Sequence, residues 1–581
     1  MAAAQDWQLQ APHGGAVHAL VDALGVSPLL AVLLVNRGFA DPASARAFLE
    51  PQLQAMRDPF AMRDAEAAGS RLANAVMAGE RVCVYGDYDV DGVSAAALLS
   101  SFLAALGRPP RVFLPDRFRD GYGLHPERVR ELCDQGVQLF VSVDCGSTAL
   151  EPIAIARGRG VDFIVVDHHQ LGPVEPDATA HLNPGRAGCG FADEPLSAVG
   201  VALVLAQATR RVLGGRGFFG AQQPPAIVDL LELAALGTIA DMVPLRGMNR
   251  VLAWHGLRRL GRSSRPGVQA LARHSKIGDQ AASSDQVGFA LGPRINAAGR
   301  VSDASVAYEL LTTVDVERAE QLAIQVEIDN TRRKELQKAV SAAAQAEAEA
   351  SVGREHALVV AGEGWHSGVV GIVAGRLKDA FEVPSFVLSI EDGVARGSGR
   401  SVHGYDLVEG LRAIDDGLFE RFGGHFFAAG VTLPAAHIDT FRRALVAHVE
   451  ATLPAAARLR PLLLDASLDV ATLDLDLLAE VERLEPCGKG NARPTFLLPQ
   501  VVVAEVRRVG DGSWIKARLV EQSDRPLWGR RGVDAFAHAD VLGSVSKGDV
   551  IDVATRLERN VWQSRHSVQA SVVAVRPAEA A

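Results

Sequence analysis

Cysteine is scarce in this chain, with five residues among 581. No two of them form a C-x-x-C pair, and their number is odd. This distribution argues against a disulfide framework and against a zinc site built from thiolates, and it favours a reducing compartment. The five are Cys83, Cys133, Cys145, Cys189 and Cys487.

The chain also lacks long apolar runs near its start. Residues Met1 to Gln10 contain neither a basic nor an apolar segment, so we expect no secretory signal. The apolar run from Pro28 to Val35 is far shorter than the ~20 residues that cross a bilayer. We therefore expect a cytoplasmic protein with no membrane partner.

Basic residues are fewer than acidic ones. The chain has 59 Lys and Arg and 69 Asp and Glu, which gives a formal net charge of -10 at pH 7. A domain that coats nucleic acid is usually basic, so the composition counts against that class of protein. An enzyme that acts on nucleic acid stays open, since metal-binding carboxylates are acidic and a basic groove can lie on an acidic body. The hydrophobic share of 48% fits a folded protein with several cores.

Short apolar runs alternate with helical stretches between about residues 80 and 170. Such alternation predicts an α/β fold with a parallel sheet covered by helices on both faces. In sheets of this kind, ligands bind beyond the carboxyl ends of the strands. The predicted strands are 81–85, 111–114, 138–143 and 162–166.

Five regions are expected along the chain. Residues 1–60 predict short helices, and the domain with the parallel sheet is expected to span 61–312. Residues 313–352 contain neither proline nor glycine and predict one long connecting helix, for which a solvated spacer is the alternative. A second α/β domain is expected over 353–455. Short strands with glycine turns over 463–577 predict a small β-barrel.

Three aspartates, Asp87, Asp89 and Asp91, alternate directly after the first predicted strand in the sequence GDYDVDG. If the backbone stays extended there, all three side chains point to one side. Carboxylates crowded in this way repel each other and persist only with cations between them. An acidic turn without a ligand is the alternative explanation for a single cluster of this kind.

Residues of the same kind follow other predicted elements. The third strand is followed by Asp144, and an apolar helix further on by Asp241. The fourth strand is followed by Asp167, His168 and His169. A lone histidine pair is usually a surface or core feature, but this pair ends a strand of the same sheet. Oxygen and imidazole ligands suit Mn²⁺ or Mg²⁺, and several carboxylates favour two ions about 3.5–4 Å apart.

The motifs GDYDVDG, VDCGS, DHH and GTIADMVPL, in this order, resemble those of the DHH phosphoesterase superfamily. The stretch GPRINAAGR resembles a motif of its RecJ exonuclease branch, and GWHSG, GSGRS and GGHFFAAG resemble the associated DHHA1 domain. The stretch EPCGKGN and the strands after it resemble the C-terminal oligonucleotide-binding (OB) fold of that branch. The resemblance covers nearly the whole chain. It implies a parallel-sheet DHH domain, a long helix, an α/β DHHA1 domain and a C-terminal OB barrel.

The resemblance also implies the roles of site residues. Asp144 is placed to bridge two metal ions, and Asp87 is a candidate beyond the ligands that match the family. His169 matches a position that faces the scissile phosphate, and we expect Asp167 to orient its histidine neighbour. Related phosphoesterases have a histidine ligand where this chain has Tyr85. The expected metal ligands are Asp87, Asp89, Asp91, Asp144, His168 and Asp241.

Candidates for phosphate binding lie in two stretches with many glycines. Arg294, Asn296 and Arg300 occur in GPRINAAGR, where a guanidinium could bind phosphate with two parallel hydrogen bonds. A structural salt bridge is the alternative for these arginines. Further on, Ser398 and Arg400 in a glycine-rich turn are expected to bind a terminal phosphate.

His425 follows two glycines at an expected helix start, where backbone N–H groups favour anions, and it is a further catalytic candidate. A tight glycine turn with an incidental histidine is the alternative. In the last segment, Arg518 and Trp514 belong to a stretch in which basic residues alternate with Trp514 and Trp528. That composition favours a surface that binds single strands, with ordinary barrel surface as the alternative.

Together these features and the resemblance imply an exonuclease specific for single-stranded DNA, which releases 5′-mononucleotides by two-metal hydrolysis in DNA repair and recombination. The 5′→3′ direction comes from the resemblance alone, as does an association with a single-strand-binding protein and a helicase. Another DHH enzyme, acting on short oligoribonucleotides, cyclic dinucleotides or pyrophosphate, is one alternative, and a non-catalytic replication scaffold is the other. The predicted barrel argues against the first alternative, and the complete set of carboxylates and histidines argues against the second.

Overall fold

The computed structural model describes residues 6–278, 281–351, 356–454, 461–563 and 565–578, without the side chains of Ser351 and Trp528. The predicted domain boundary at 352/353, and most of the one at 455–463, lie outside these residues. The described residues fall into two compact units. One is formed by Pro115–Gly121 and Pro293–Arg460, and the other by Asp6–Leu114, Tyr122–Gly292 and Pro461–Ala581. Among the described helices, none is both long and apolar enough to pass through a bilayer.

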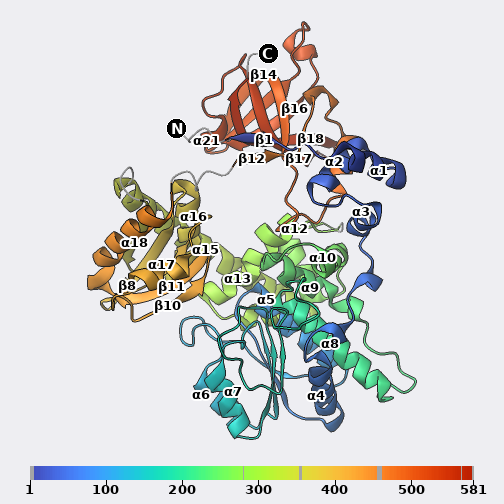
Figure 1. Cartoon of the computed structure of the whole chain (residues 1–581), viewed down its shortest axis with the longest axis vertical. Helices are drawn as coiled ribbons and strands as arrows, with labels where there is room; N and C mark the ends of the chain where they lie inside the picture. Colours follow the sequence, from blue (N-terminus) through green and yellow to red (C-terminus); the bar gives the residue numbers. More distant parts are fainter. Residues whose placement is uncertain (1–5, 279–280, 352–355, 455–460, 564, 579–581) are drawn as a thin grey trace. The chain divides into compact units, whose positions relative to one another are not determined.

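A five-stranded parallel sheet lies in the larger unit, as the sequence predicts (Figure 1). Its strand order is β3-β2-β4-β5-β6, and every neighbouring pair is parallel. The fifth strand, β6, was not predicted. The carboxyl ends of all five strands therefore meet at one edge. The strands are β2 (Val82–Tyr85), β3 (Arg111–Phe113), β4 (Leu139–Val143), β5 (Asp162–Val166) and β6 (Ala180–Leu182).

Helices cover this sheet on both sides. Helices α6 (Pro126–Asp134) and α7 (Leu150–Gly158) enclose a core with Tyr85 and Phe140 of the strands. Helix α5 (Val90–Ala105) is buried over most of its length, as its apolar and alanine-rich sequence predicts. The remaining helices around the sheet are α4 (Ala65–Ala78), α8 (Ala198–Gly215), α9 (Leu231–Ala240), α10 (Gly247–Leu260), α11 (Pro266–His274), α12 (Ser284–Gln286) and η4 (Val287–Leu291), with η3 (Ile227–Leu230) before α9.

The smaller unit contains a mixed sheet of order β10-β11-β9-β8-β7, in which only β7 and β8 are parallel. A single helix, α15 (Val316–Ser351), runs where the sequence predicts a long one. Its residues Val340 and Ala344 are buried in a core with α16 and β7, so α15 is a packed element and not a solvated spacer. The other elements are α13 (Gly292–Val301), α14 (Ser305–Thr312), β7 (Leu358–Glu363), α16 (Ser367–Phe381), β8 (Ser385–Glu391), β9 (Val394–Arg400), α17 (Leu407–Ile414), β10 (Arg421–His425), β11 (Ala428–Pro434) and α18 (Ile438–Thr452).

The last segment forms a closed ring of strands, drawn in red and orange in Figure 1, which confirms the predicted barrel. The ring closes because β14 pairs with β15 through one half and with β17 through the other. Bulges in β14, at Val503/Glu505 and at Leu498/Val501, accompany this change of partner. The strands are β13 (Ala466–Ser467), β14 (Phe496–Val509), β15 (Trp514–Val520), β16 (Gly532–His538), β17 (Val550–Trp562) and β18 (Arg565–Pro577), and α20 (Leu475–Glu482) and α21 (Ala539–Leu542) accompany them.

The N-terminal segment folds into the predicted short helices, α1 (Gly14–Leu24), α2 (Pro28–Asn36) and α3 (Pro42–Leu49). Helices α2 and α3 begin after capping side chains, Ser27 and Asp41, with proline at the first helical position. Their apolar faces share a core with residues of the last segment, including Phe496. Strand β1 (Trp7–Leu9) pairs with β12 (Leu462–Leu464) as well. The start of the chain is thus part of the packing around the barrel, which the sequence did not predict.

Candidate metal centre

The candidate site lies where the strand order reverses. The chain passes from β2 to β3 on one side and returns to β4 on the other side of β2. At such a reversal the loops after the two central strands lead away from each other, and ligands bind between them. Asp87 and Asp89 follow β2, Asp144 follows β4, and Asp167, His168 and His169 follow β5.

The condition of an extended backbone is not met as far as Asp91, because only four residues separate the end of β2 from α5, which begins at Val90. Asp89 caps this helix, and its Oδ1 accepts hydrogen bonds from the N–H groups of Asp91 (2.9 Å) and Gly92 (3.1 Å). A Cβ at Gly92 would lie 2.7 Å from Cβ of Asp87, so the turn requires glycine. The three aspartates still face the same centre. Asp87 and Asp89 lie near Asp144, and Asp91 lies near His168 and Asp241.

Asp91 lies in the first turn of α5, and its carboxylate also accepts hydrogen bonds from the start of a second helix, α8. Its Oδ2 accepts a hydrogen bond from the N–H of Ala198 at 2.6 Å, and its Oδ1 accepts one from the N–H of Val199 at 3.0 Å. These two groups form the N-terminal turn of α8. A Cβ at Gly237 of α9 would lie 2.4 Å from Oδ1 of Asp91, so α9 also limits the position of this carboxylate. Asp91 thus has a fixed orientation before any ligand binds.

Asp144 has a left-handed backbone, with φ of 64°. This conformation costs an L-residue roughly 1–2 kcal/mol, and it tends to persist at functional sites. The backbone N–H of Asp144 donates to the carbonyl of Val166 at 3.0 Å, which keeps the residue beside the end of β5. The strained turn therefore directs Asp144 toward the histidines that follow β5.

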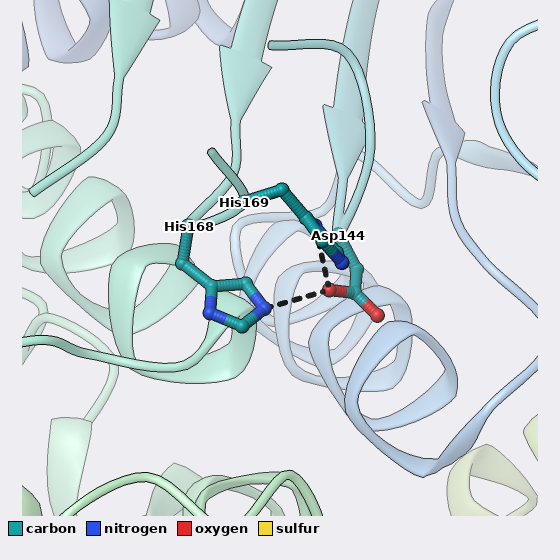
Figure 2. A group of neighbouring side chains, drawn as sticks. All are labelled: Asp144, His168 and His169. Carbon is teal, nitrogen blue, oxygen red and sulfur yellow. Dashed lines mark ion pairs between the residues drawn. The ribbon is translucent and has the colours of Figure 1, made fainter. Parts of the chain in front are cut away.

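Three groups of side chains place their ligand atoms within 4.8 Å of one another: Asp144, His168 and His169; Asp91, His168 and Asp241; and Asp87, Asp89 and Asp144. Figure 2 shows that the two histidines approach the same oxygen of Asp144. Nε2 of His168 lies 3.3 Å from Oδ1 of Asp144 and 3.9 Å from Oδ2 of Asp91. Its Nδ1 lies 3.7 Å from Oδ2 of Asp241. Asp144 and His168 each belong to two groups and therefore link the three.

Asp167 does not belong to these groups and orients His169 instead. Its Oδ1 accepts hydrogen bonds from Nδ1 of His169 (2.8 Å) and from the N–H of His168 (2.7 Å). Its Oδ2 accepts one from the N–H of Ser147 at 2.9 Å. The buried carboxylate thus fixes both histidines relative to the loop after β4.

Two residues around His169 were not found from the sequence. Nδ2 of Asn183 donates to the carbonyl of His169 at 2.9 Å and to Oγ of Ser147 at 2.9 Å. The hydroxyl of Tyr122 lies 3.2 Å from Nδ1 of His169 and donates to the carbonyl of Asp144 at 3.1 Å. Tyr122 follows a stretch with four charged residues, DRFRDG, which is a local signal that could have pointed to it, whereas the residues directly beside Asn183 are uncharged.

Burial and mutual repulsion shift the pKa values of the carboxylates upward. Burial raises the pKa of Asp91 and that of Asp241 to about 7, and the charges of Asp241 and Asp89, respectively, add to these shifts. Burial together with Asp89 and Asp91 raises the pKa of Asp144 well above its usual value. Such a group resists ionisation unless cations compensate the charge.

The two histidines differ in their pKa values. Burial lowers the pKa of His168, so its ring is neutral near pH 7 and can act as a ligand. Burial has the same effect on His169, but the hydrogen bond to Asp167 outweighs it and raises the pKa to about 9. Burial opposes the ionisation of Asp167, yet the same hydrogen bond and the charges of both histidines hold its pKa below the usual range.

The donor set fits divalent cations. Oδ1 of Asp144 and Nε2 of His168 are buried, and neither finds a hydrogen-bond partner among the described residues. Buried polar atoms of this kind normally have a partner, so these two atoms are suited to bind an ion. Carboxylate oxygens with imidazole nitrogen, and no thiolate in the three groups, match Mn²⁺ or Mg²⁺. At the position where related phosphoesterases have a histidine ligand, the ring of Tyr85 is buried and lies 4.9 Å from the ring of Phe113.

Arg294, Asn296 and Arg300 lie in helix α13 of the smaller unit. Arg294 forms a salt bridge with Glu327 of α15. A structural salt bridge was the alternative to phosphate binding for this residue. Nη1 of Arg300 donates to the carbonyl of Gly368 at 3.0 Å. Both arginines are thus tied to neighbouring elements of their own unit, and their contact with DNA stays a prediction.

The predicted turn around Ser398 and Arg400 is wrong, because both residues lie in strand β9. The glycines serve strand packing here, since a Cβ at Gly397 would lie 2.2 Å from the carbonyl oxygen of Val387 in β8. The helix start expected at His425 is wrong too. His425 ends strand β10, which pairs with β11 in an antiparallel hairpin, so no helix N-terminus favours an anion there.

On the barrel, Arg518 and Lys516 share Asp534, with N–O distances of 3.2 and 2.7 Å. They line a pocket of about 650 Å³ together with other basic residues, Arg507, Arg530 and Lys547. Trp514 is 51% exposed, and its ring meets His538 edge-on at 5.9 Å. The side chain of Trp528 lies outside the described part of the chain. An exposed aromatic ring near basic side chains is compatible with strand binding, which stays a prediction.

Comparisons with known proteins agree with this arrangement. Family models match three stretches: the DHH family N-terminal domain at 81–238, the DHHA1 domain at 354–451 and the RecJ OB domain at 464–574. The single-stranded-DNA-specific exonuclease RecJ of Salmonella typhimurium is 34% identical, over 93% of this chain and 94% of that protein. RecJ of Bacillus subtilis is 34% identical, over 98% of this chain and 70% of that protein.

A solved structure extends the match to the whole fold. The crystal structure of RecJ from Thermus thermophilus in complex with Mn²⁺ matches with a TM-score of 0.84 and 31% identity. The match covers 99% of this chain and 80% of that one. The resemblance found in the sequence motifs is confirmed, as is the predicted fold class. On these grounds the chain belongs to the RecJ family.

Proposed function

We propose that this chain is a metal-dependent exonuclease that degrades single-stranded DNA in the 5′→3′ direction and releases 5′-mononucleotides, in DNA repair and recombination. The names of its relatives, single-stranded-DNA-specific exonucleases, support this activity. The observation that carries the proposal is the convergence of three groups of carboxylates and histidines within 4.8 Å at the carboxyl edge of one sheet. A two-metal phosphodiesterase needs such a site.

We assign two divalent cations, Mn²⁺ or Mg²⁺, to this site. Bound there, the cations would supply Lewis-acid activation of a water molecule and neutralise charge on the phosphate. Asp144 would help to hold both ions, because it belongs to two of the three groups and, unlike His168, which also belongs to two, its carboxylate offers two oxygens on one planar group. Asp91 is held by α8 and Asp89 by the first turn of α5, so these ligands need little reorganisation. The ligands in this proposal are Asp87, Asp89, Asp91, Asp144, His168 and Asp241.

We propose that His169 contacts the scissile phosphate. Asp167 binds Nδ1 of the ring at 2.8 Å. Nε2, which lies 3.3 Å from the hydroxyl of Tyr122, is then the atom that would donate to a phosphate oxygen. Asn183 holds the backbone of His169, and Tyr122 contacts the ring, which together limit its rotation. A donor fixed in this way stabilises the charge that develops on the phosphate without reorganisation during the reaction.

The remaining assignments rest on the sequence motifs. His425 stays a catalytic candidate, and the candidate DNA contacts are Arg294, Asn296, Arg300, Ser398, Arg400, Arg518 and Trp514. We keep the domain limits 1–60, 61–312, 313–352, 353–455 and 463–577 as a proposal. A DNA substrate and five free cysteines support a cytoplasmic location. A single-strand-binding protein and a helicase are proposed partners.

The test is digestion of single-stranded DNA that carries a 5′-terminal label, with Mn²⁺ present. We expect labelled 5′-mononucleotide as the first product, no digestion of blunt duplex, and loss of activity with EDTA. Asp144→Ala should abolish hydrolysis and remain folded, because it removes the ligand shared by two groups. Asp22→Ala, which removes an exposed carboxylate of α1, is the matched control and should stay active.

Other results would contradict the proposal. Label released in fragments longer than mononucleotides would refute the proposed product, and shortening of the strand from its 3′ end would refute the direction. Faster hydrolysis of short oligoribonucleotides, cyclic dinucleotides or pyrophosphate than of long DNA would favour another DHH activity. Binding of DNA without any hydrolysis in Mn²⁺ would favour the scaffold. Near-native activity in Asp144→Ala would refute the metal assignment.

A further inference from the structure

The loop EPCGKGN, residues 485–491, lies against the residues that follow Asp241. The backbone N–H of Leu245 donates to the carbonyl of Lys489 at 2.8 Å, and Nε of Arg246 donates to the carbonyl of Gly490 at 2.9 Å. A Cβ at Gly488 would lie 2.8 Å from Cδ1 of Leu245. The backbone of the loop is therefore pressed against the segment that begins at Asp241, only four residues before Leu245.

Hydrogen bonds within the loop itself also keep it rigid. Gly488 and Asn491 exchange two backbone hydrogen bonds, of 2.9 and 3.1 Å. Nδ2 of Asn491 donates to the carbonyls of Leu484 and Pro486, each at 2.8 Å, and Asn491 is only 1% exposed. The ends of the loop are thus tied together, and Lys489 lies at its tip.

A buried arginine anchors the same loop to α10. Arg250 is 2% exposed, and its guanidinium donates to the carbonyls of Glu485 (3.0 Å) and Pro486 (3.2 Å). It also donates to the carbonyl of Phe48 at 2.6 Å and lies 3.5 Å from the centre of that ring. Burying a cation costs free energy unless its donors are satisfied, so this set of acceptors fixes the loop firmly.

Lys489 itself is exposed and makes no ion pair among the described residues. Its carbonyl accepts the hydrogen bond from Leu245, and the next residue, Gly490, lies against Pro244, so the side chain of Lys489 starts beside the short segment that follows Asp241. This backbone contact places Lys489 close to the edge of the metal centre. Cations bound by Asp241 would neutralise that carboxylate and repel the ammonium group. An incoming anion is then the partner that remains for Lys489.

We propose that Lys489 contacts a phosphate of the DNA strand at the edge of the metal centre, and that the anchored loop 485–491 presents it there. This inference rests on the proposed nuclease function. It makes the C-terminal segment contribute directly to the site that the DHH domain builds, through a loop outside the barrel strands. A lysine binds phosphate as a point charge, so the contact adds affinity without base specificity.

The test compares Lys489→Met and Lys489→Arg with the matched control Lys276→Met, which removes an exposed lysine from the loop after α11. Steady-state kinetics on 5′-phosphorylated single strands would be measured at several salt concentrations, together with the Mn²⁺ concentration for half-maximal activity. For Lys489→Met we expect KM to rise about tenfold, as a lost contact of ~1.4 kcal/mol gives. The slope of log KM against log salt should fall by about 0.7, the value for one phosphate on a single strand.

Lys489→Arg should keep most of the affinity, and Lys276→Met should behave as wild type. The Mn²⁺ requirement and the melting temperature should not change in any of the three variants. A wild-type KM and salt slope in Lys489→Met would overturn the inference. A shifted Mn²⁺ requirement with an unchanged salt slope would overturn it too, because Lys489 would then act on the metal site. If the wild-type chain itself does not digest single strands, the proposed function fails, and the inference fails with it.

Discussion

Replacement of Asp241 by asparagine should stabilise the metal-free protein. Asp241 lies at the C-terminal end of α9, where the helix dipole disfavours a negative charge. Burial and the charge of Asp89 raise its pKa to about 7, and the described residue nearest to it as an ion-pair partner is His168, at 3.7 Å. Asparagine has nearly the same shape and removes the charge. The charges of His169 and Lys489 offset only part of the cost of the ionised carboxylate, and bound cations would offset the rest.

The size of the effect follows from the shift in pKa. An aspartate titrates near 3.9 in the unfolded chain, so a shift of about 3 units corresponds to at most ~4 kcal/mol. Asp241 is 25% exposed and shares its charge with neighbours, so we expect about 2 kcal/mol. Because the folded pKa is raised, the native state holds the proton longer than the unfolded state. Stability is therefore lost as the pH rises from about 4 to about 7, and the full penalty applies above that window.

The assay is thermal unfolding in EDTA at about pH 8 and about pH 5. The midpoint is measured for the unfolding transition that moves to higher temperature when Mn²⁺ is added. At the higher pH, Asp241→Asn should raise the midpoint by about 4 °C, and the gain should shrink at the lower pH. Mn²⁺ should stabilise the variant less than the wild type, and Asp22→Asn should change neither midpoint. An Asp241→Asn midpoint in EDTA at or below the wild-type value at about pH 8 would refute the reasoning. An equal gain at both pH values would refute it as well.

Three further predictions follow from contacts in the larger unit. Asp167→Asn should lower kcat about 100-fold, because His169 loses the charge that orients its ring, and an unchanged kcat in steady-state assays would contradict this. Gly237→Ala should weaken Mn²⁺ activation at least about tenfold, because its Cβ would displace Asp91, and a wild-type Mn²⁺ titration would argue against that. Arg250→Met should destabilise the protein by about 3 kcal/mol, because several buried carbonyls lose their donor, and a denaturant midpoint within error of wild type would contradict it.

The parallel sheet and the barrel could be predicted because hydrophobic periodicity is a local signal. Strands β2 to β5 and helix α15 occur where apolar runs and the absence of proline and glycine place them. The packing of α1 to α3 on the barrel could not be predicted, since it joins residues more than 400 positions apart, such as Leu20 and Phe496. The turn at Ser398 and the helix start at His425 were wrong for one reason. Glycines there make room for neighbouring strands, and sequence alone does not separate that use from a turn.

The candidate ligands could be predicted as a set, but their grouping could not. Alternation after β2 suggested one row of three carboxylates, whereas the immediate start of α5 separates Asp91 from Asp87. The role of Asp91 at the N-terminus of α8 depends on a contact across 107 positions. Asn183 and Tyr122 act on His169 through a backbone carbonyl and a ring contact. Such contacts exist only once the chain is folded.

The most direct test of the central claim is the anomalous-scattering map of a crystal grown with Mn²⁺. We predict two manganese peaks about 3.5–4 Å apart at the carboxyl edge of the parallel sheet, with Asp144 bound to both ions. A map with no manganese near Asp144 and His168, or with a single ion far from both, would contradict the claim that these distant stretches of chain meet to hold a pair of cations.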